Sequence, residues 1–314
     1  MKSIKNIKIG GGGLKNNLFL APMLGFTNFA FRELIQKNAK IAVFTEMIPI
    51  NALSKDSNYC KDLIIRGSSE RNVFYQFFGN NEKKLVKSIQ NILDLNIKID
   101  FIDLNCGCPA QDIVLQGAGC ALLKRESKIK SMIQASKKAF DIPFTIKIRT
   151  GYDKPKHLDY KALEDSGCDA LFVHGRTKKQ QYSGNIDLKF IKEAKERTDL
   201  PIIANGNIKD LKDIQKVYFQ TDCDGYMIGR QALTNPFVFR EIINGNYSTF
   251  YERIDFLDKY YKKMLDNNIN CAFQNAKLLS LFLVREIKDA SKIRERISKT
   301  KEFEELLQIV ESIK

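Results

Sequence analysis

The stretch LFLAPMLGFTN, residues 18–28, decides between the two folds that the sequence allows. It begins as an apolar strand and ends in a turn, and the rest of the chain alternates apolar strands with amphipathic helices. Such alternation is typical of a parallel sheet covered by helices, either closed into a barrel or open and doubly wound. A doubly wound sheet usually has a glycine-rich phosphate-binding turn after its first strand. Here that turn is PMLGFTN, which favours the barrel.

Eight apolar segments are predicted to be strands: Leu18–Met23, Ala42–Met47, Val73–Phe78, Phe101–Asn105, Phe144–Arg149, Ala170–His174, Ile202–Asn205 and Gly225–Ile228. Amphipathic helices are predicted between most of them, as at Glu82–Asp94, Asp187–Arg197 and Asp210–Phe219. The last two begin at an aspartate that can cap the first turn. Eight such units predict an α/β fold, a (β/α)8 TIM barrel. Gly10–Gly13 precede the first barrel strand without a following helix, so we expect a hairpin turn at the bottom of the barrel.

The pattern changes near Gly245, where NGNYSTF indicates a linker. Later residues show helical spacing and no strand pattern, as in Phe256/Tyr260/Met264, Ala276–Ile287 and Phe303–Ile313. We therefore expect residues 1–244 to form the barrel and residues 245–314 to form a small all-helical domain of three or four helices.

The chain is strongly basic, with 51 Lys and Arg against 37 Asp and Glu and a net charge of +14. Residues 245–314 hold 13 basic and 11 acidic residues, so the barrel region carries +12 of the excess. This balance suits a polyanionic partner. A genome rich in Lys and Asn codons explains it equally well, because Asn and Ile are also abundant.

The seven cysteines are too few and too scattered for a disulfide framework. Cys106 and Cys108 have no matching Cys or His cluster, so no metal site is expected. No run of about 18 apolar residues indicates a membrane span. The segment MKSIKNIKIGGGG lacks the apolar stretch of a signal peptide, and we expect a cytoplasmic protein.

Polar or glycine residues stand at nearly every predicted strand end, which is where barrels carry their chemistry. The strand ends, in order, hold Pro22, Met23, Glu46, Gln76, Asn105 to Cys108, Lys147, Arg149, His174 to Arg176, Asn205 to Asn207, Gly229 and Arg230. The last two strand ends, NGN and GR, are typical of the phosphate site of this fold. Gly206 lets the backbone approach an anion, and Arg230 can bind phosphate oxygens.

Lys147 lies within the apolar strand TIKIRTG, where a buried lysine needs an anionic partner. A flavin meets this need, because its N1–C2=O edge becomes anionic on reduction. Gln76 can both donate to and accept from the same edge. A structural ion pair of Lys147 with Glu46 or Asp103 remains the alternative.

The motifs APMLGFTN, TEM, QFFG, DLNCGCPA, GAGCALL, KIRTG, VHGRT, ANGNI and MIGRQAL occur in the order seen in tRNA-dihydrouridine synthases. The chain resembles this family over most of residues 18–243, and GRT, SGNID and PFVFREI resemble its bacterial B-type branch. One departure is NGN where the family usually has NGD. The resemblance implies reduction of tRNA uridines to 5,6-dihydrouridine with FMN, which NADPH or NADH reduces. It also implies tRNA recognition by the helical tail, and we expect a monomer with neither a membrane nor a DNA partner.

The resemblance places the catalytic cysteine at Cys108, and a thiol that is protonated at neutral pH can supply the proton for C5 of uracil. It implies an FMN site of Pro22, Met23, Leu24, Gln76, Lys147, His174, Asn205, Gly206, Asn207, Gly229 and Arg230. The expected substrate-binding residues are Asn105, Arg149 and Arg176, with Arg176 facing tRNA. Cys106 is expected to pack in the core, and the alternative is that Cys106 is the acid and Cys108 is structural.

Three other functions compete with this one. A flavin enzyme that reduces a free pyrimidine would need neither a basic surface nor a helical tail. A non-redox phosphate-binding barrel would hold no flavin, and a tRNA-binding protein without catalysis would not depend on Cys108.

Overall fold

The computed structural model describes residues 3–267, 269, 271–286 and 289–313. Within them, eight parallel strands close into a barrel. The last strand, β11, pairs with the first, β3, and the ring is completed where β4 pairs with β6. The strands are β3 (Leu18–Leu20), β4 (Ala42–Phe44), β6 (Val73–Phe78), β7 (Phe101–Cys106), β8 (Phe144–Gly151), β9 (Ala170–Thr177), β10 (Ile202–Asn205) and β11 (Gly225–Ile228). The predicted TIM barrel is confirmed. A two-residue strand, β5 (Ile48–Pro49), which the sequence did not indicate, also pairs with β6.

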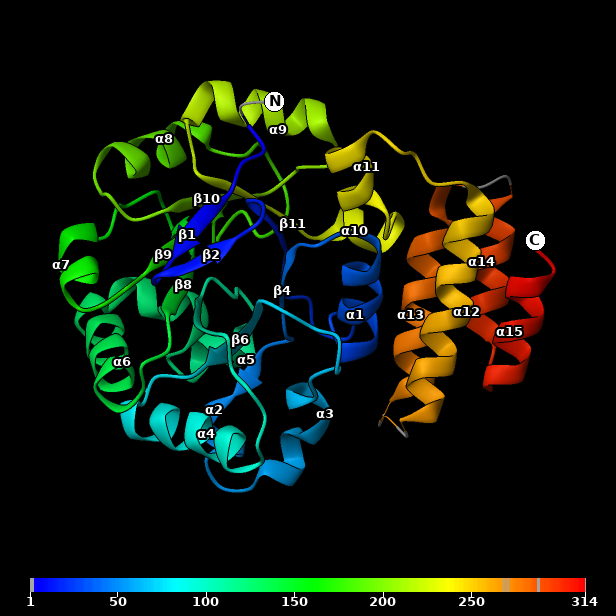
Figure 1. The fold of residues 1–314 in the computed structure, drawn as a ribbon, viewed down its shortest axis with the longest axis horizontal. Helices are drawn as coiled ribbons and strands as arrows, with labels where there is room; N and C mark the ends of the chain where they lie inside the picture. The colour runs from blue at the N-terminus through cyan, green and yellow to red at the C-terminus, as the bar shows by residue number, and fades with distance from the viewer. Residues whose placement is uncertain (1–2, 268, 270, 287–288, 314) are drawn as a thin grey trace.

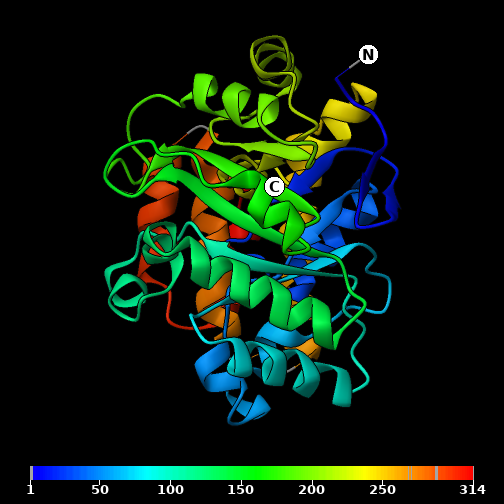
Figure 2. The same cartoon turned by 90° about the vertical axis from the view of Figure 1, so that its left-hand side faces the viewer.

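Helices surround the barrel (Figures 1 and 2). The longer ones are α1 (Phe29–Asn38), α4 (Glu82–Asp94), α6 (Glu126–Ala139), α8 (Leu188–Glu196), α9 (Leu211–Thr221) and α11 (Val238–Asn244). The shorter ones are α2 (Ile50–Leu53), α3 (Lys61–Ile64), α5 (Gln111–Leu115), α7 (Tyr160–Asp165) and α10 (Arg230–Thr234). Asp187 and Asp210 cap α8 and α9 as predicted, each accepting a backbone N–H of the first turn.

A hairpin closes the bottom of the barrel, as the GGGG stretch predicted. Its strands β1 (Ile7–Ile9) and β2 (Gly12–Leu14) pair antiparallel and place three apolar side chains in the interior cluster with Phe74, Phe101 and Phe172. Gly10, in the turn, has φ +54°, and a Cβ there would lie 2.5 Å from the Cβ of Pro143. A side chain at this position would therefore push the hairpin away from the barrel.

In the described part of the chain, four helices follow the barrel: α12 (Phe250–Asp266), α13 (Ala272–Leu283), α14 (Ala290–Lys299) and α15 (Phe303–Glu311). Helix α13 begins four residues before the predicted stretch 276–287 and ends at Leu283. Ile287, the predicted end, lies outside the described residues. None of the described helices is long and apolar enough to cross a membrane.

The helical tail packs against the first β/α unit of the barrel, beside α1 (Figure 1). Phe31 of α1 makes edge contacts with Phe256 and Tyr260 of α12. Asn28 Nδ2 donates to the Tyr260 hydroxyl at 2.7 Å, and Glu33 forms an ion pair with Lys263. Although burial favours the neutral acid, hydrogen bonds from Lys263 and Ser69 lower the pKa of Glu33 to about 2. Removal of the tail would expose these aromatic rings, so point substitutions separate the two parts better than truncation.

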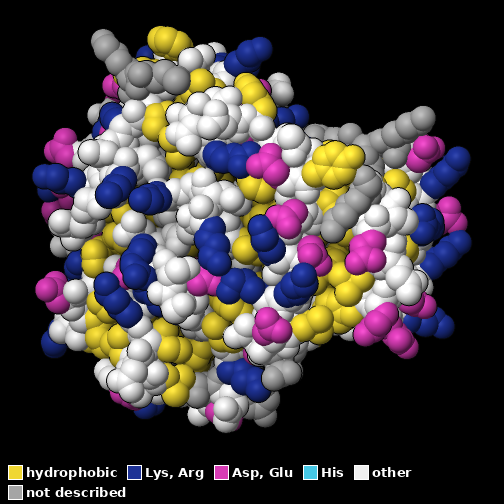
Figure 3. Space-filling view, turned by 45° about the vertical axis from the view of Figure 1, so that its right-hand side comes forward, with side chains coloured by type: hydrophobic (Ala, Val, Ile, Leu, Met, Phe, Trp, Pro, Cys, Tyr) yellow, Lys and Arg dark blue, Asp and Glu magenta, His cyan; other side chains and the backbone are white. Residues whose placement is uncertain are grey.

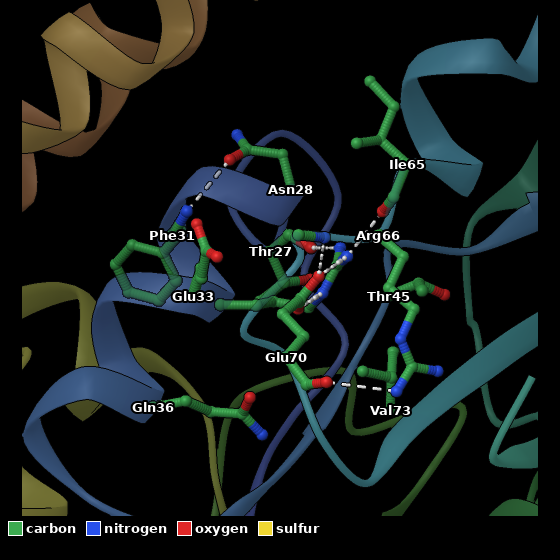
Figure 4. A network of polar contacts seen from close by, with 12 residues as sticks. Thr27, Asn28, Phe31, Glu33, Gln36, Thr45, Ile65, Arg66, Glu70 and Val73 are labelled. Atoms are coloured by element: carbon green, nitrogen blue, oxygen red, sulfur yellow. Dashed lines mark hydrogen bonds and ion pairs between the residues drawn. The ribbon is translucent and has the colours of Figure 1, made fainter. Parts of the chain in front are cut away.

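A buried ion pair lies beneath this junction (Figure 4). The Arg32 guanidinium, 1% exposed, donates to both carboxylate oxygens of Glu70 at 2.7 and 3.0 Å. It also donates to the backbone carbonyls of Thr27 and Ile65, each at 2.8 Å. Glu70 in turn accepts the backbone N–H of Gly67 at 2.6 Å. The Arg32–Glu70 pair thus connects the loop after β3 to the segment that precedes β6.

Candidate active site

The site is built by the alternation of side chains along β6, β7 and β8. Phe74 and Phe101 fill the lower interior of the barrel, and the next inward positions are polar. Strand pairing sets Gln76 beside Asp103 and, one layer higher, Asn105 beside Lys147. The carboxyl ends of neighbouring strands thereby bring the predicted polar residues to one end of the barrel.

Four side chains of β6, β7 and β8 form a continuous hydrogen-bonded chain: Thr145, Asp103, Gln76 and Asn105. Asp103, fully buried, accepts from the Thr145 hydroxyl and from Gln76 Nε2, both at 2.7 Å. Gln76 Oε1 accepts from Asn105 Nδ2 at 2.9 Å. Burial raises the pKa of Asp103 to about 7, against the opposing effect of these donors. Both ends of the Gln76 amide are therefore engaged within the protein.

Asn105 connects this chain to the loop that carries Cys108. Its Oδ1 accepts the backbone N–H of Gly107 at 3.0 Å and that of Cys108 at 2.8 Å. Cys108 is partly exposed, and burial raises the pKa of its thiol, so the thiol is protonated at neutral pH. Cys106 points the other way into the hydrophobic core, as expected for a packing residue.

Lys147 is held by an amide rather than by a carboxylate. Its Nζ donates to Asn205 Oδ1 at 3.1 Å, and Asn205 Nδ2 donates to the carbonyl of Met227. Among the described residues, neither Glu46 nor Asp103 forms an ion pair with Lys147, although the charge of Asp103 acts to raise the pKa of Lys147. Burial, reinforced by the charge of Arg149, lowers the pKa of Lys147 to about 8. The ammonium group therefore lacks the close anionic partner that its burial favours.

Four cations lie around His174, in the C-terminal half of β9. Burial and the charges of Lys147, Arg149, Arg176 and Arg230 lower the pKa of His174 to about 2, so this imidazole is neutral. Its ring lies near Tyr182, whose ring also faces the guanidinium groups of Arg149 and Arg230. This end of the barrel is therefore strongly electropositive and suits an anionic ligand.

Two predicted substrate-binding arginines are buried. Arg176 is 2% exposed and donates to the carbonyl of Gly184 and to Asn207 Oδ1, so the expectation that it faces tRNA is wrong. Arg149 is 3% exposed and donates to the carbonyls of Gly107 and Thr177. Carbonyl groups of the loop after β9 hold both guanidinium groups, and Arg149 also supports the Cys108 loop. A lone sequence shows the arginines but not the loop that folds over them.

The other predicted residues flank the same opening. Pro22, Met23 and Leu24 form the loop after β3, where the Leu24 side chain is 62% exposed. Gly229 and the exposed Arg230 lie at the start of α10. Gly206 has φ +125°, and a Cβ there would lie 2.4 Å from Ile186 and 3.1 Å from the His174 ring. Close packing within the protein thus requires glycine at position 206.

Sequence reasoning missed two members of the site. Asp103 was considered only as a partner of Lys147, although the alternation in FIDLN places it on the same face as Asn105. Tyr182 belongs to a polar loop, QQYSGN, and no signal in the sequence indicates that its ring reaches the site.

Comparison with known proteins identifies the family of this chain. The family model "Dihydrouridine synthase (Dus)" matches residues 19–314. The chain is 34% identical to tRNA-dihydrouridine synthase B of Pseudomonas aeruginosa, over 75% of this chain and 71% of that protein. It is 37% identical to tRNA-dihydrouridine synthase B of Vibrio parahaemolyticus, over 75% and 74%. A probable tRNA-dihydrouridine synthase of Rickettsia bellii is 35% identical, over 75% and 73%.

Solved structures share the fold at low identity. Histamine dehydrogenase from Rhizobium sp. aligns with a TM-score of 0.57 at 12% identity, covering 82% of this chain and 50% of that one. A morphinone reductase mutant aligns with a TM-score of 0.54 at 10% identity, covering 76% and 90%. These likenesses support the barrel alone, whereas the family model and the sequence relatives cover most of the chain. The chain therefore belongs to the dihydrouridine synthase family.

Proposed function

We propose that this protein reduces the C5=C6 bond of uridines in tRNA to 5,6-dihydrouridine, using FMN that NADPH reduces. The observation that carries the proposal is the position of Cys108 in a member of this family. The thiol of Cys108 is protonated and partly exposed. It lies on a loop that Asn105 holds, at the strand end next to Lys147. A proton donor and a buried lysine held by an amide oxygen thus share one end of the barrel.

The residues at this end fit a flavin mononucleotide. Lys147 has one amide oxygen as its partner and can donate further to an anionic ring edge. Arg230 is exposed beside the neutral His174, where it can bind a phosphate group. When bound and reduced, the flavin supplies the hydride that C6 of uracil receives.

The residues of the chain supply the rest of the reaction. Cys108 donates its proton to C5 from the face of the base opposite the hydride donor. Arg149 and Asn105 hold the backbone of the Cys108 loop from two sides, through the carbonyl and the N–H of Gly107. Because the Asn105 amide is engaged by Gln76 and by this loop, we propose that Asn105 acts on the substrate through Cys108.

We further propose that residues 1–244 perform the chemistry and that residues 245–314 select the tRNA position. Figure 3 shows many Lys and Arg side chains across the middle of the face in view, in keeping with a surface that meets phosphates. A uridine inside folded tRNA is stacked, so the enzyme must draw the base out to reach it.

The proposal is tested on the purified full-length protein. We expect a visible flavin spectrum after addition of FMN, bleaching by NADPH, and return of the colour when unmodified tRNA is added under anaerobic conditions. Mass spectrometry of the tRNA should then show dihydrouridine. Reoxidation by free uridine but not by tRNA would support the free-pyrimidine alternative. A protein that takes up no FMN would overturn the proposal.

Lys147→Met should weaken FMN binding by about 10- to 100-fold, since a hydrogen bond to a charged group contributes roughly 1.5–3 kcal/mol. The methionine preserves most of the side-chain volume and removes the charge. Fluorescence titration with FMN measures the affinity. Lys179→Met, in the exposed part of the loop after β9, is the control and should bind FMN like the wild type. Unchanged binding by Lys147→Met would assign Lys147 a structural role.

Two tail arginines are candidates for contact with tRNA phosphates. Arg285 and Arg294 line a cleft of about 580 Å³ with Leu281, and Arg285 stacks over Phe282, whose ring meets Phe26 of the barrel. Charge reversal of both arginines to Glu should weaken tRNA binding and reduce the slope of log K against log salt by about 1 for each lost contact. FMN binding should not change.

Lys259→Glu on α12 is the matched control, because Lys259 is an exposed tail lysine outside this cleft. If the control weakens tRNA binding as much as the double reversal, the cleft has no special role. Binding is measured by filter retention at several salt concentrations.

A further inference from the structure

The buried carboxylate of Asp103 has no role in the proposed reaction, yet it begins the hydrogen-bonded chain that ends at the Cys108 loop. Its two oxygens accept from Thr145 and Gln76, and no part of the side chain reaches solvent. From Gln76 the chain continues through Asn105 to the backbone N–H of Cys108. Asp103 thus lies two side chains away from the proton donor.

Every hydrogen bond in this chain has the direction that an ionised carboxylate at position 103 requires. An ionised carboxylate only accepts, so the Gln76 amide must present its NH2 group to Asp103. Gln76 Oε1 then faces Asn105, which must donate with its own NH2 group. The remaining acceptor, Asn105 Oδ1, is left facing the loop, where Gly107 and Cys108 both donate to it.

Reversal of the first bond would reverse all the others. If Gln76 turned its oxygen toward position 103, its NH2 group would face Asn105, and Asn105 would turn its own NH2 group toward two backbone N–H donors. Donors would then face donors, and the Cys108 loop would lose the acceptor that holds it.

We propose that Asp103 is a positioning residue, which fixes the orientation of the Gln76 and Asn105 amides and thereby holds the Cys108 loop in the geometry for proton delivery. The effect of Asp103 on catalysis rests on the function proposed above. The structural part does not, because every hydrogen bond in it joins residues of the chain itself.

The variants follow from the same reasoning. Asp103→Asn keeps the shape but can offer either an oxygen or an NH2 group to Gln76. The Thr145 hydroxyl can accept from that NH2 group and donate instead to the carbonyl of Ile102, 3.3 Å away, which preserves the native direction. Thr145→Val removes this option. In the double variant the new NH2 group has lost its Thr145 acceptor and Gln76 has lost the charged acceptor that fixes its amide, so the chain is weakened. Thr145→Val alone keeps the carboxylate.

The first measurement needs neither cofactor nor substrate. Selective 15N-cysteine labelling of the full-length protein gives one amide signal for each of the seven cysteines, and Cys108→Ala identifies the Cys108 signal. At about pH 8, where Asp103 is ionised, solvent exchange of the Cys108 amide should become at least about tenfold faster in the double variant. It should stay within about threefold of wild type in Thr145→Val. Cys223, between α9 and β11, serves as the internal control.

Two results would overturn the inference. One is an unchanged Cys108 amide in the double variant. The other is faster exchange at Cys223 as well, because that would indicate general loosening of the barrel. Faster exchange confined to the Cys108 loop supports the inference.

The second measurement addresses catalysis with the FMN-loaded protein. Reoxidation by tRNA should be at least about tenfold slower in the double variant than in Thr145→Val, with reduction by NADPH within about threefold. Equal losses in the two half-reactions would overturn the positioning role. If wild type itself is not reoxidised by tRNA, the proposed function fails, and the amide measurement still decides the inference.

Discussion

Cys108→Ala is expected to slow dihydrouridine formation by about 10²–10⁴-fold, the usual cost of losing a positioned general acid. The thiol is partly exposed and burial raises its pKa, so at neutral pH it carries the proton that C5 requires. The variant should keep its fold and its FMN. It should also accept electrons from NADPH at the normal rate, since that half-reaction needs no proton for uracil. Stopped-flow reoxidation of the reduced protein by tRNA measures the affected step.

Cys106→Ala is the matched control for this prediction. Cys106 lies two residues away, is fully buried, and packs in the core between the barrel and its helices. Its replacement should leave reoxidation by tRNA close to wild type. If Cys106→Ala stalls this step and Cys108→Ala does not, the acid has been assigned to the wrong cysteine. If neither variant stalls it, the proton comes from another group.

Glu70→Ala should lower the free energy of unfolding by about 3–5 kcal/mol, because it leaves the Arg32 guanidinium buried without its counter-charge. Arg32 is 1% exposed, and its other acceptors are two backbone carbonyls that cannot neutralise it. Urea unfolding, followed by circular dichroism, measures the loss. A variant as stable as wild type would show that water or a rearranged side chain replaces the carboxylate.

A double variant separates the unpaired charge from simple loss of packing. Arg32→Met with Glu70→Leu removes both charges and fills similar volumes, so it should recover much of the stability lost in Glu70→Ala. Asp165→Ala, which removes the partner of the exposed Lys161, serves as a surface control and should change stability little. Equal losses in Glu70→Ala and the double variant would argue that packing, not charge, dominates at this position.

The barrel could be predicted from sequence because its signals are local. Apolar segments of strand length, the cap residues Asp187 and Asp210 and the GGGG turn each act over a few neighbouring residues. All eight strands form, although β3 and β4 end three residues before the predicted ends and β9 continues three residues further. The polar strand ends could be found for the same reason, since the barrel brings all carboxyl ends to one side.

What the sequence could not show depends on contacts between distant segments. Arg176 looks like an exposed cation in VHGRT, but carbonyl groups of residues 183 and 184 fold over it and bury it. Asp103 looks like one acidic residue among many, and only its burial against Gln76 and Thr145 reveals the network. The pairing of Asn28 with Tyr260 spans 232 residues and has no local signature.

This last contact bears on how enzymes of this kind could be recombined. Helix α11 ends at Asn244 and α12 begins at Phe250, but part of the surface that receives the tail is made by residues 25–33, near the other end of the sequence. A chimera joined at residue 245 would set a foreign α12 against Asn28, Phe31 and Glu33, which are matched to the native Tyr260, Phe256 and Lys263. A test of the proposed role of the tail by exchange between relatives should therefore transplant two separate segments together, the tail and the first helix on which it rests.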